Sequence, residues 1–489
     1  MIPVLLIVIP LVIGLLSFFI RSEAVAKSTA LIASLAVLLV SALGLTVYNQ
    51  YEYLHADVEW MPSLGSSFSV SLDGMGQMLT LLTALAFPIV FISTYRSTYK
   101  KPGSFYGLML LSQAGLMGVF LAVDALLFYF FWELALIPAY FLCSIWGGER
   151  RIAVTWKFFI YTFVASLLML VGIIYIYSQT PDQSFALTSF YNVKLGYPQQ
   201  SWLFWLMFVA FAVKMPVFPF HTWQPDTYEQ SPTAVTMILS GVMVKMGVFA
   251  VIRWLVPVLP IASWAWGDTV SVLCVIGMLY ASILAMRQDD MKRLIAYSSI
   301  AHIGLMCLAI FASNNSGMQG VMIQMFNHGI NIIGMWIVVE MIERQFGTRK
   351  MSELGGLAQT APALSILFVV VALANVALPL TNGFIGEFLM FNGVYNSAIT
   401  KYNEVFAVLA VITIILSAVY TLNMVQKIFF GNTNTLTAGA RDIVFNEKAA
   451  LAVIVVLILV IGVYPSPVLE LTQSTVDSIL SKMITKNPG

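Results

Sequence analysis

The chain has 489 residues, of which 60% are hydrophobic and 10% are charged. Because soluble domains are about a quarter charged, this composition excludes an ordinary water-soluble protein and indicates an integral membrane protein. The formal net charge of +1 gives no basic field for nucleic acid, and the scattered cysteines (Cys143, Cys274 and Cys307) form no C-x-x-C metal or iron–sulfur motif. Glycine-rich nucleotide-binding patterns are also absent from the sequence.

Apolar stretches recur from end to end, and a bilayer-crossing helix needs about 20 such residues. The sequence therefore predicts an all-α polytopic membrane protein with about fourteen transmembrane helices and no soluble domain. The spans are expected near residues 2–20, 27–48, 74–95, 104–122, 125–146, 158–177, 201–220, 232–252, 262–286, 294–313, 318–342, 362–391, 404–427 and 449–469. The first is expected to be a retained span, since no positively charged segment precedes it.

The lysines and arginines favour one orientation of these spans. If the N-terminus lies outside, most of the 24 Lys and Arg residues fall in inner loops, as the positive-inside rule requires. The expected outer loop at 49–73 agrees, because it carries Asp and Glu but neither Lys nor Arg. We therefore expect both termini on the outer side of a bacterial cytoplasmic membrane.

Two spans are interrupted by proline. The seventh contains FAVKMPVFPFHTW (211–223), with Pro216 and Pro219, and the twelfth contains ALANVALPLTNGFIGEF (372–388), with Pro379. Proline removes a helix hydrogen bond, and in lipid the freed backbone groups need a protein partner or a water-filled cavity. Broken helices in two halves of a chain are typical of transporters with internal repeats.

Four charged side chains are predicted inside the bilayer: Glu133, Lys214, Lys245 and Glu387. Placing one such charge at the centre of a membrane helix costs about 2.5–3.5 kcal/mol on insertion scales, so each charge calls for an explanation. An inert buried ion pair is one reason. A proton path is the other, because moving a carboxylate toward or away from a lysine changes the proton affinity of the lysine. Charges of both signs on four spans favour the proton path.

Several weaker candidates accompany these charges. Histidine titrates near neutrality and can link proton carriers, although a buried histidine can equally be a hydrogen-bonded core residue. Side chains that could order water lie four residues apart on their helices. Other polar groups at span ends could gate access or simply face solvent. The histidines are His302 and His328, and the side chains that could order water are Ser298, Asn327 and Asn331. The polar groups at span ends are Asp124, His221 and Asp226.

The stretch AFAVKMPVFPFHTWQPDTYEQSPTAVTMILSGVMVKMG (210–247) resembles the antiporter-like membrane subunits of respiratory complex I. The similarity extends essentially over the whole chain, through DALLFYFFWELALIPAYFL (124–142), RLIAYSSIAHIGLM (293–306), MFNHGI (325–330) and PLTNGFIGEF (379–388). Among the types of this family the chain is most similar to the M type, which carries glutamate in the twelfth span where the L, N and Mrp types carry lysine. Here that residue is Glu387.

The resemblance implies a proton-translocating membrane subunit of NADH:quinone oxidoreductase. Glu133 and Lys214 would form a charge switch, Lys245 would be the central carrier, and Glu387 would be the exit-side group, with His302 and His328 between them. NADH, FMN, iron–sulfur clusters and quinone would be bound by other subunits, and L-type and N-type subunits would be neighbours within the lipid membrane. The chain departs from the family at Gln224, Thr227 and Tyr228, which puts local gating in question.

The resemblance also implies an organisation in four parts. Three N-terminal spans (1–103) would precede two inverted repeats, spans four to eight (104–253) and nine to thirteen (254–430), and a last span with a short tail (431–489) would follow. Three alternatives remain: a subunit of an Mrp-type cation/proton antiporter, a membrane subunit of an energy-converting hydrogenase, and a purely structural scaffold.

Overall fold

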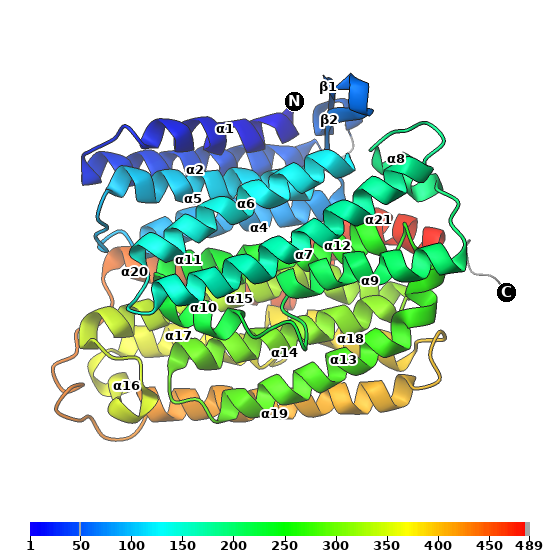
Figure 1. Cartoon of the computed structure of the whole chain (residues 1–489). Coiled ribbons are helices and arrows are strands. Elements are labelled where there is room, and N and C mark those ends of the chain that lie inside the picture. The colour runs from blue at the N-terminus through cyan, green and yellow to red at the C-terminus, as the bar shows by residue number, and fades with distance from the viewer. Residues whose placement is uncertain (48–49, 485–489) are drawn as a thin grey trace.

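The computed structural model describes residues 1–47 and 50–484, and its long helices run side by side in a common direction (Figure 1). Eleven helices of this described part are long and apolar enough to cross a membrane, and two more, Ile2–Ser17 and Pro362–Asn375, are apolar but shorter. The chain is therefore a helical membrane protein. The spans Thr233–Leu255 and Asn315–Phe346 are buried along their whole apolar windows, so they form the centre of the bundle.

The first part of the bundle contains α1 (Ile2–Ser17), α2 (Glu23–Thr46), α4 (Gly74–Ser93), α5 (Pro102–Leu121), α6 (Ala125–Trp146), α7 (Arg151–Gln179) and α9 (Tyr197–Lys214). The central span consists of α11 (Thr233–Ile238), the π-helix η2 (Leu239–Met243), α12 (Lys245–Ala250) and the π-helix η3 (Val251–Leu255). The remaining long helices are α13 (Pro260–Met286), α14 (Met291–Phe311), α15 (Asn315–Phe346), α17 (Pro362–Asn375), α18 (Asn382–Tyr395), α19 (Asn403–Phe429), α20 (Phe445–Val463) and α21 (Ser466–Ile484). Short elements join them: α3 (Tyr51–Leu54), η1 (Pro62–Leu64), α8 (Leu187–Asn192), α10 (Gln224–Gln230), η4 (Met351–Glu353) and α16 (Leu357–Thr360).

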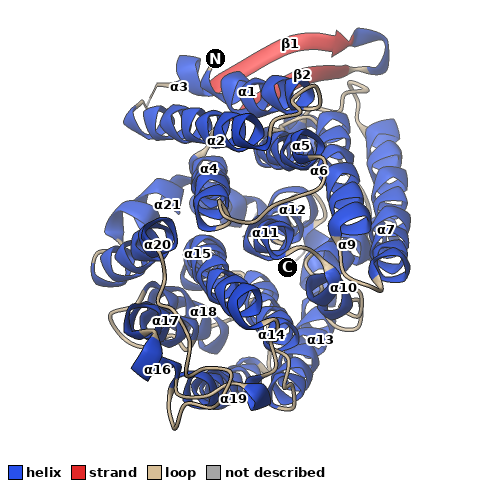
Figure 2. Cartoon of the chain, turned by 90° about the vertical axis from the view of Figure 1, so that its left-hand side faces the viewer, coloured by secondary structure: helices blue, strands red, loops and turns tan. Residues whose placement is uncertain are grey.

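The two ends of the bundle differ, and we name them here. The hairpin face carries a two-stranded sheet, α8 and α21 (Figure 1). The basic face lies at the opposite end, where α2, α5 and α7 begin beside Arg21, Lys101 and Arg150. Figure 2 views the molecule from the basic face, with α11, α12 and α15 near the middle of the bundle.

The hairpin is a departure from the expected all-α fold. Strand β1 (His55–Met61) pairs antiparallel with β2 (Ser66–Ser71), and His55 lies opposite Ser71. The turn between them needs Gly65, whose φ of 69° is left-handed and whose Cβ would lie 2.1 Å from the carbonyl oxygen of Gln183. The expectation of helices alone is wrong at this loop, because short strands in a polar loop give no span-length signal.

The C-terminal tail is also more ordered than expected. Helix α20 ends at Val463, before Pro465, and α21 begins at Ser466, so the predicted span 449–469 overlaps two helices. A proline disfavours helical backbone at the residue before it, which accounts for the break. Instead of a short tail, α21 is an amphipathic helix that packs on α4 and α15 at the hairpin face.

Both proline-rich spans are discontinuous. Helix α9 ends at Lys214, and regular α-helix resumes only with α10 at Gln224. Helix α17 ends at Asn375 and α18 begins at Asn382. In the second break Ala377 and Leu380 have positive φ angles of 57° and 73°, which non-glycine residues rarely adopt. Such local strain persists only where the surrounding structure holds it in place.

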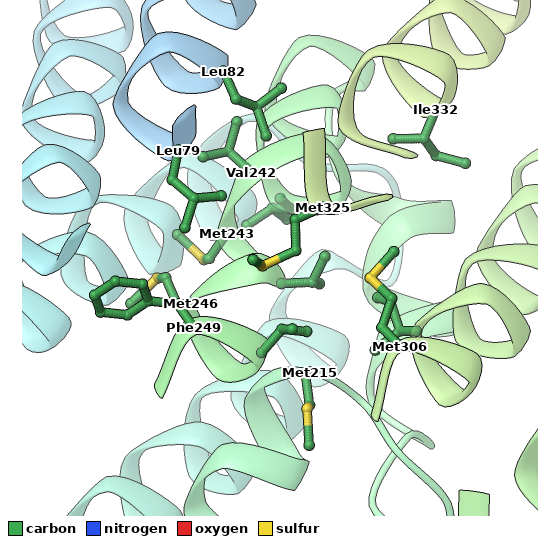
Figure 3. Close-up of a cluster of buried hydrophobic side chains, with 14 of the residues drawn as sticks. Leu79, Leu82, Met215, Val242, Met243, Met246, Phe249, Met306, Met325 and Ile332 are labelled. Atoms are coloured by element: carbon green, nitrogen blue, oxygen red, sulfur yellow. The ribbon is translucent and has the colours of Figure 1, made fainter. Parts of the chain in front are cut away.

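Methionine-rich packing fills the centre of the bundle (Figure 3). Met215 follows Lys214, Met246 follows Lys245, and Met306 and Met325 come from α14 and α15. All four are fully buried. Methionine is flexible and fills irregular gaps, so it can pack around charged side chains without supplying polar atoms of its own.

Candidate functional site

Lys245 lies at the start of α12, between the two π-helices of the central span. Its side chain is fully buried, and its Nζ atom donates a 2.8 Å hydrogen bond to the carbonyl oxygen of Ser240. The same Nζ atom lies 2.9 Å from Nδ1 of His328 on α15. Single π turns inside helices are frequent at functional sites, and here they flank the buried amine.

A second contact joins His302 of α14 to Glu387 of α18. The Nδ1 atom of His302 lies 3.0 Å from Oε1 of Glu387, and both side chains are buried. The rings of His302 and His328 are neighbours, tilted by 54° with their centroids 5.6 Å apart. Lys245, His328, His302 and Glu387 therefore form one sequence of neighbouring side chains from four helices, which we call the buried relay.

A small cavity adjoins the Glu387 end of the buried relay. His302 and Glu387 line it together with Thr413, Ser417 and Tyr420 of α19, and it has room for about one water molecule. These hydroxyl groups give such a water hydrogen-bonding partners, so this end of the buried relay can be hydrated.

The predicted amide and hydroxyl candidates lie at the break between α17 and α18. Asn327 donates a 2.7 Å hydrogen bond to the carbonyl oxygen of Asn382, and Asn331 donates one of 3.4 Å to that of Ala374. Ser298 accepts hydrogen bonds from Asn375 at 3.4 Å and from Tyr420 at 3.0 Å. These side chains therefore supply partners that a broken membrane helix requires.

Lys214 and Glu133, which we call the switch pair, are held in a different way from the residues of the buried relay. Lys214 ends α9, is buried, and has no hydrogen-bond partner for Nζ among the described residues. Its Nζ atom lies 5.6 Å from the centre of the Trp132 ring. No ion pair between Glu133 and Lys214 within 4.0 Å is present in the described part of the chain.

Glu133 lies on the outer side of α6. It lines an apolar groove of about 380 Å³ together with Trp60 of the hairpin and with Phe130 and Ile137 of its own helix. One carboxylate oxygen of Glu133, Oε1, is buried without a hydrogen-bond partner among the described residues. Glu133 is thus half-buried at the edge of the bundle, whereas Lys214 lies inside it.

The helix that carries Lys245 approaches the end of α9 closely. A Cβ atom on Gly247 would lie 2.6 Å from Cβ of Met215 and 2.7 Å from the carbonyl oxygen of Phe211. Only glycine fits this position without a shift. The helices that carry Lys214 and Lys245 are therefore in direct contact, and Met215 and Met246, the residues that follow these lysines, belong to one buried cluster (Figure 3).

The three remaining candidates from the sequence also lie outside the buried relay. Asp124 is the N-cap of α6, accepting hydrogen bonds from the backbone N–H groups of Leu126, Leu127 and Ser67 and from the Ser66 hydroxyl. Burial raises the pKa of Asp124 above its ordinary value, although these hydrogen bonds oppose the shift. His221 packs against the rings of Phe218 and Tyr280 after the α9 break.

Asp226, the third, belongs to a network of ion pairs at the basic face. It pairs with Lys157 at 2.9 Å and with Arg293 at 3.1 Å, and Arg293 also pairs with Glu229 at 2.8 Å. Arg349 joins the network through Glu229, Asp290 and Glu343. Burial by itself would lower the pKa of Arg349, but these carboxylates raise it above its ordinary value. The network fixes α10 against α14 and α15.

A larger cavity of about 520 Å³, the basic-face cavity, lies beside this network. Its lining includes Glu229, Ser231, Thr233, Lys292, Glu340 and Glu343. Sequence reasoning missed this cavity, although Glu340 and Glu343 follow His328 and Asn331 on one helix. Gln224 and Tyr228 of α10 are buried, and both amide atoms of Gln224 and the hydroxyl of Tyr228 have no hydrogen-bond partner among the described residues. Such atoms are commonly satisfied by water.

No group of three or more His, Cys, Asp or Glu side chains placed to hold a metal ion occurs within residues 1–47 and 50–484. The chemistry that the arrangement itself offers is proton transfer. An amine, two imidazoles and a carboxylate are in sequence, and each can both gain and lose a proton.

Comparison with known proteins shows that the chain is similar to the members of one family. Residues 122–417 match the family model described as NADH:quinone oxidoreductase/Mrp antiporter, TM. The chain is 35% identical to the F(420)H(2) dehydrogenase subunit M of Methanosarcina mazei, over 98% of this chain and 99% of that one. It is 33% identical to the NADH-quinone oxidoreductase subunit M of Escherichia coli, over 86% of this chain and 84% of that one.

Solved structures give the same result for the fold. A chain of respiratory complex I from Thermus thermophilus with bound NADH superimposes with a TM-score of 0.91 at 27% identity, covering 99% of this chain and 100% of that one. A chain of the Mrp complex from Dietzia sp. superimposes with a TM-score of 0.87 at 19% identity, covering 99% of both. Both of these similar chains come from multi-subunit complexes.

Proposed function

Since the chain belongs to the NADH:quinone oxidoreductase/Mrp antiporter family and is an antiporter-like, proton-translocating subunit of the M type, we propose that protons cross it along the buried relay. One observation carries this proposal, the uninterrupted neighbourhood of Lys245, His328, His302 and Glu387, with a 2.9 Å contact at one end and a 3.0 Å contact at the other. Proton transfer requires such distances, either directly or through one water.

Protons reach Lys245 from the basic face in this proposal. The basic-face cavity supplies acidic groups at the surface, and Gln224 and Tyr228 supply unpartnered polar atoms further in. Ser240 holds the amine at the end of this path, because its carbonyl oxygen accepts a hydrogen bond from Nζ of Lys245. The positive-inside rule makes the basic face the cytoplasmic side, so both termini lie outside.

The switch pair controls this relay electrostatically. When Glu133 moves toward Lys214, the lysine holds its proton, and its positive charge then disfavours a second proton on Lys245. When the carboxylate moves away, the effect reverses. The half-buried position of Glu133 at the edge of the bundle supports this role, since a neighbouring subunit can act on it there.

The architecture that we propose has fourteen crossings and two inverted repeats, 104–253 and 254–430, after three N-terminal spans (1–103) and before α20 and α21. It is supported by the breaks at α9/α10 and α17/α18, which occupy corresponding places in the two repeats. The eleven long apolar spans of the described chain give fourteen crossings when α1, the broken α9/α10 span and the broken α17/α18 span are added.

The host complex that we propose is a bacterial NADH:quinone oxidoreductase in the cytoplasmic membrane, with L-type and N-type subunits as neighbours. This chain contributes the proton path of that translocase and carries no redox centre, whereas NADH, FMN, iron–sulfur clusters and quinone belong to other subunits. A second candidate host is an F(420)H(2) dehydrogenase. The Methanosarcina relative favours it, because it matches nearly the full length of both chains.

Membranes with the assembled complex test the proposal. Lys245→Ala is expected to abolish proton pumping and to slow quinone-coupled electron transfer, while electron transfer from the same donor to an artificial acceptor stays intact. Lys401→Ala, at an exposed site between α18 and α19, is the matched control for loss of a lysine. Normal pumping by assembled Lys245→Ala complex would refute the proposal. Activity with NADH or with F(420)H(2) separates the two hosts.

A further inference from the structure

A second buried cation lies on the central span. Arg253 is in η3, eight residues beyond Lys245 toward the hairpin face, which corresponds to about 12 Å along a helix. Its side chain is only 10% exposed. The proton path from the basic face to Glu387 does not need Arg253, so its burial calls for a separate explanation.

Arg253 is held firmly in place. Its Nη2 atom lies 2.6 Å from Oδ2 of Asp73, the residue that also caps α4 by accepting a 2.9 Å hydrogen bond from Gly76. Its guanidinium group lies 5.4 Å from the centre of the Phe249 ring, and its carbonyl oxygen accepts a hydrogen bond from the hydroxyl of Tyr191. The Asp73 side chain is 31% exposed, so the carboxylate faces outward and the cation faces the interior.

The central span is apolar between Lys245 and Arg253, since residues 246–252 carry no polar side chain. Met246 and Phe249 of α12 are fully buried there, and Leu79 of α4 packs in the same cluster (Figure 3). Lys482 adds a further positive charge near Arg253 at the hairpin face, since its Nζ atom lies 5.0 Å from the ring of Tyr191, the residue that binds the carbonyl oxygen of Arg253. A proton that left Lys245 in this direction would meet apolar side chains and then a fixed positive charge.

The corresponding stretch of α15 beyond His328 carries buried polar side chains among its apolar ones. On α15 the buried amides of Gln324 and Gln319 follow one another toward the hairpin face. Gln319 donates a 2.7 Å hydrogen bond to Gln473 of α21, and Gln473 donates one of 2.8 Å to Asp477. This side of the molecule therefore leads through amides to an exposed carboxylate, whereas on the Lys245 side the buried Arg253 cation lies inside the Asp73 carboxylate.

We propose that Arg253, paired with Asp73, is an electrostatic barrier that closes the hairpin-face end of the central span to protons. A fixed cation in a low-dielectric surrounding repels hydronium strongly, and channels use buried arginines to exclude protons and cations. With this direction closed, a proton on Lys245 passes sideways to His328 and Glu387. Arg253 is thus a positioning residue for the direction of transfer, and this role rests on Lys245 being a proton carrier.

The experiment measures passive proton leak in proteoliposomes that contain the whole complex, with electron transfer switched off. Arg253→Gln is expected to dissipate an imposed pH difference about tenfold faster, the factor that corresponds to about 1.4 kcal/mol of barrier. Arg253→Lys keeps the cation and should stay tight. Asp73→Asn keeps both Arg253 and a good helix cap, so it should also stay tight.

Two outcomes would overturn the proposal: an assembled Arg253→Gln complex as tight as the wild type, or an Asp73→Asn complex that leaks as much as Arg253→Gln. The second outcome would assign the seal to packing instead of charge. If Arg253→Gln lowers the amount of complex, Arg253→Met carries the same test, because its side chain can still pack on Phe249. Failure of the proposed function is distinguishable, since it would show as normal pumping by Lys245→Ala.

Discussion

The switch pair and the buried relay contain the same kinds of charged group but hold them in opposite ways. In the buried relay every side chain has a titratable neighbour on another helix, as Lys245 has His328 and Glu387 has His302. In the switch pair the amine of Lys214 has no hydrogen-bond partner among the described residues, and Glu133 lies at the edge of the bundle. Titratable groups in contact, as in the buried relay, are suited to proton transfer. Separated charges, as in the switch pair, are suited to electrostatic control, because a small displacement changes the interaction between two charges most where the dielectric is low.

The largest effect is expected from interrupting the buried relay. His302→Leu removes the only side chain of the relay that contacts both His328 and Glu387. Pumping should fall by about tenfold or more, as expected when a positioned acid–base group is lost. The measurement is the proton-to-electron ratio in inverted membrane vesicles. His302→Gln, which keeps a polar group, should lose less, and equal losses in both variants would argue against proton transfer by the imidazole.

A smaller effect is expected from the switch pair. Glu133→Ala and Lys214→Ala should leave artificial-acceptor oxidation intact and lower quinone-coupled turnover and pumping by about fivefold, the lower end of typical coupling between sites. The two changes together should cost little more than either alone, since each removes the same interaction. Turnover of the double variant checks this. Strictly multiplicative losses would mean that the two side chains act independently.

The sequence could predict the identity of these residues but not their partnerships. Lys214, Lys245, Glu133 and Glu387 stand out because a charge in a span is costly, whatever surrounds it. The pairing of Lys245 with His328 depends on how α12 packs on α15 and on two π turns, and neither leaves a periodic signal. For the same reason Asp124 could be named only as a group that gates access or faces solvent, whereas the structure places it in a helix cap.

The loops were harder to predict than the spans. A membrane-crossing helix is recognised by its length and hydropathy, whereas the β1–β2 hairpin and α21 are shorter or amphipathic and depend on contacts with the bundle. Gly74 illustrates such a contact, since a Cβ atom there would lie 2.0 Å from the carbonyl oxygen of Leu471 in α21. Sequence position alone does not reveal that these two segments touch.

The contact between the helices of the switch pair and of the buried relay can be tested by enlarging one side chain, at Gly247. Gly247→Val would force Met215 and Phe211 away from α12, and overpacking of this kind typically costs about 1–3 kcal/mol. We expect a lower thermal stability of the complex and a lower pumping ratio, because the helices of the switch pair and the buried relay would separate. Gly439→Val is the control, since nothing lies within 4 Å of its Cβ position. Unchanged stability in Gly247→Val would show that the helix contact is loose.

The smallest effect concerns Asp124, which belongs to neither region and fastens the hairpin to α6. Asp124→Ala should destabilise the protein by about 1 kcal/mol, the usual cost of a lost N-cap, and Asp124→Asn should cost less. Because the pKa of Asp124 is raised in the fold, its stabilising contribution is full below the unfolded pKa and is lost as the pH rises through the folded one. Asp124→Asn should therefore remove a small decrease in thermal stability that the wild type shows with rising pH above the usual aspartate range. A wild type whose stability rises with pH in that window, relative to Asp124→Asn, would mean that the four hydrogen bonds to the carboxylate outweigh its burial.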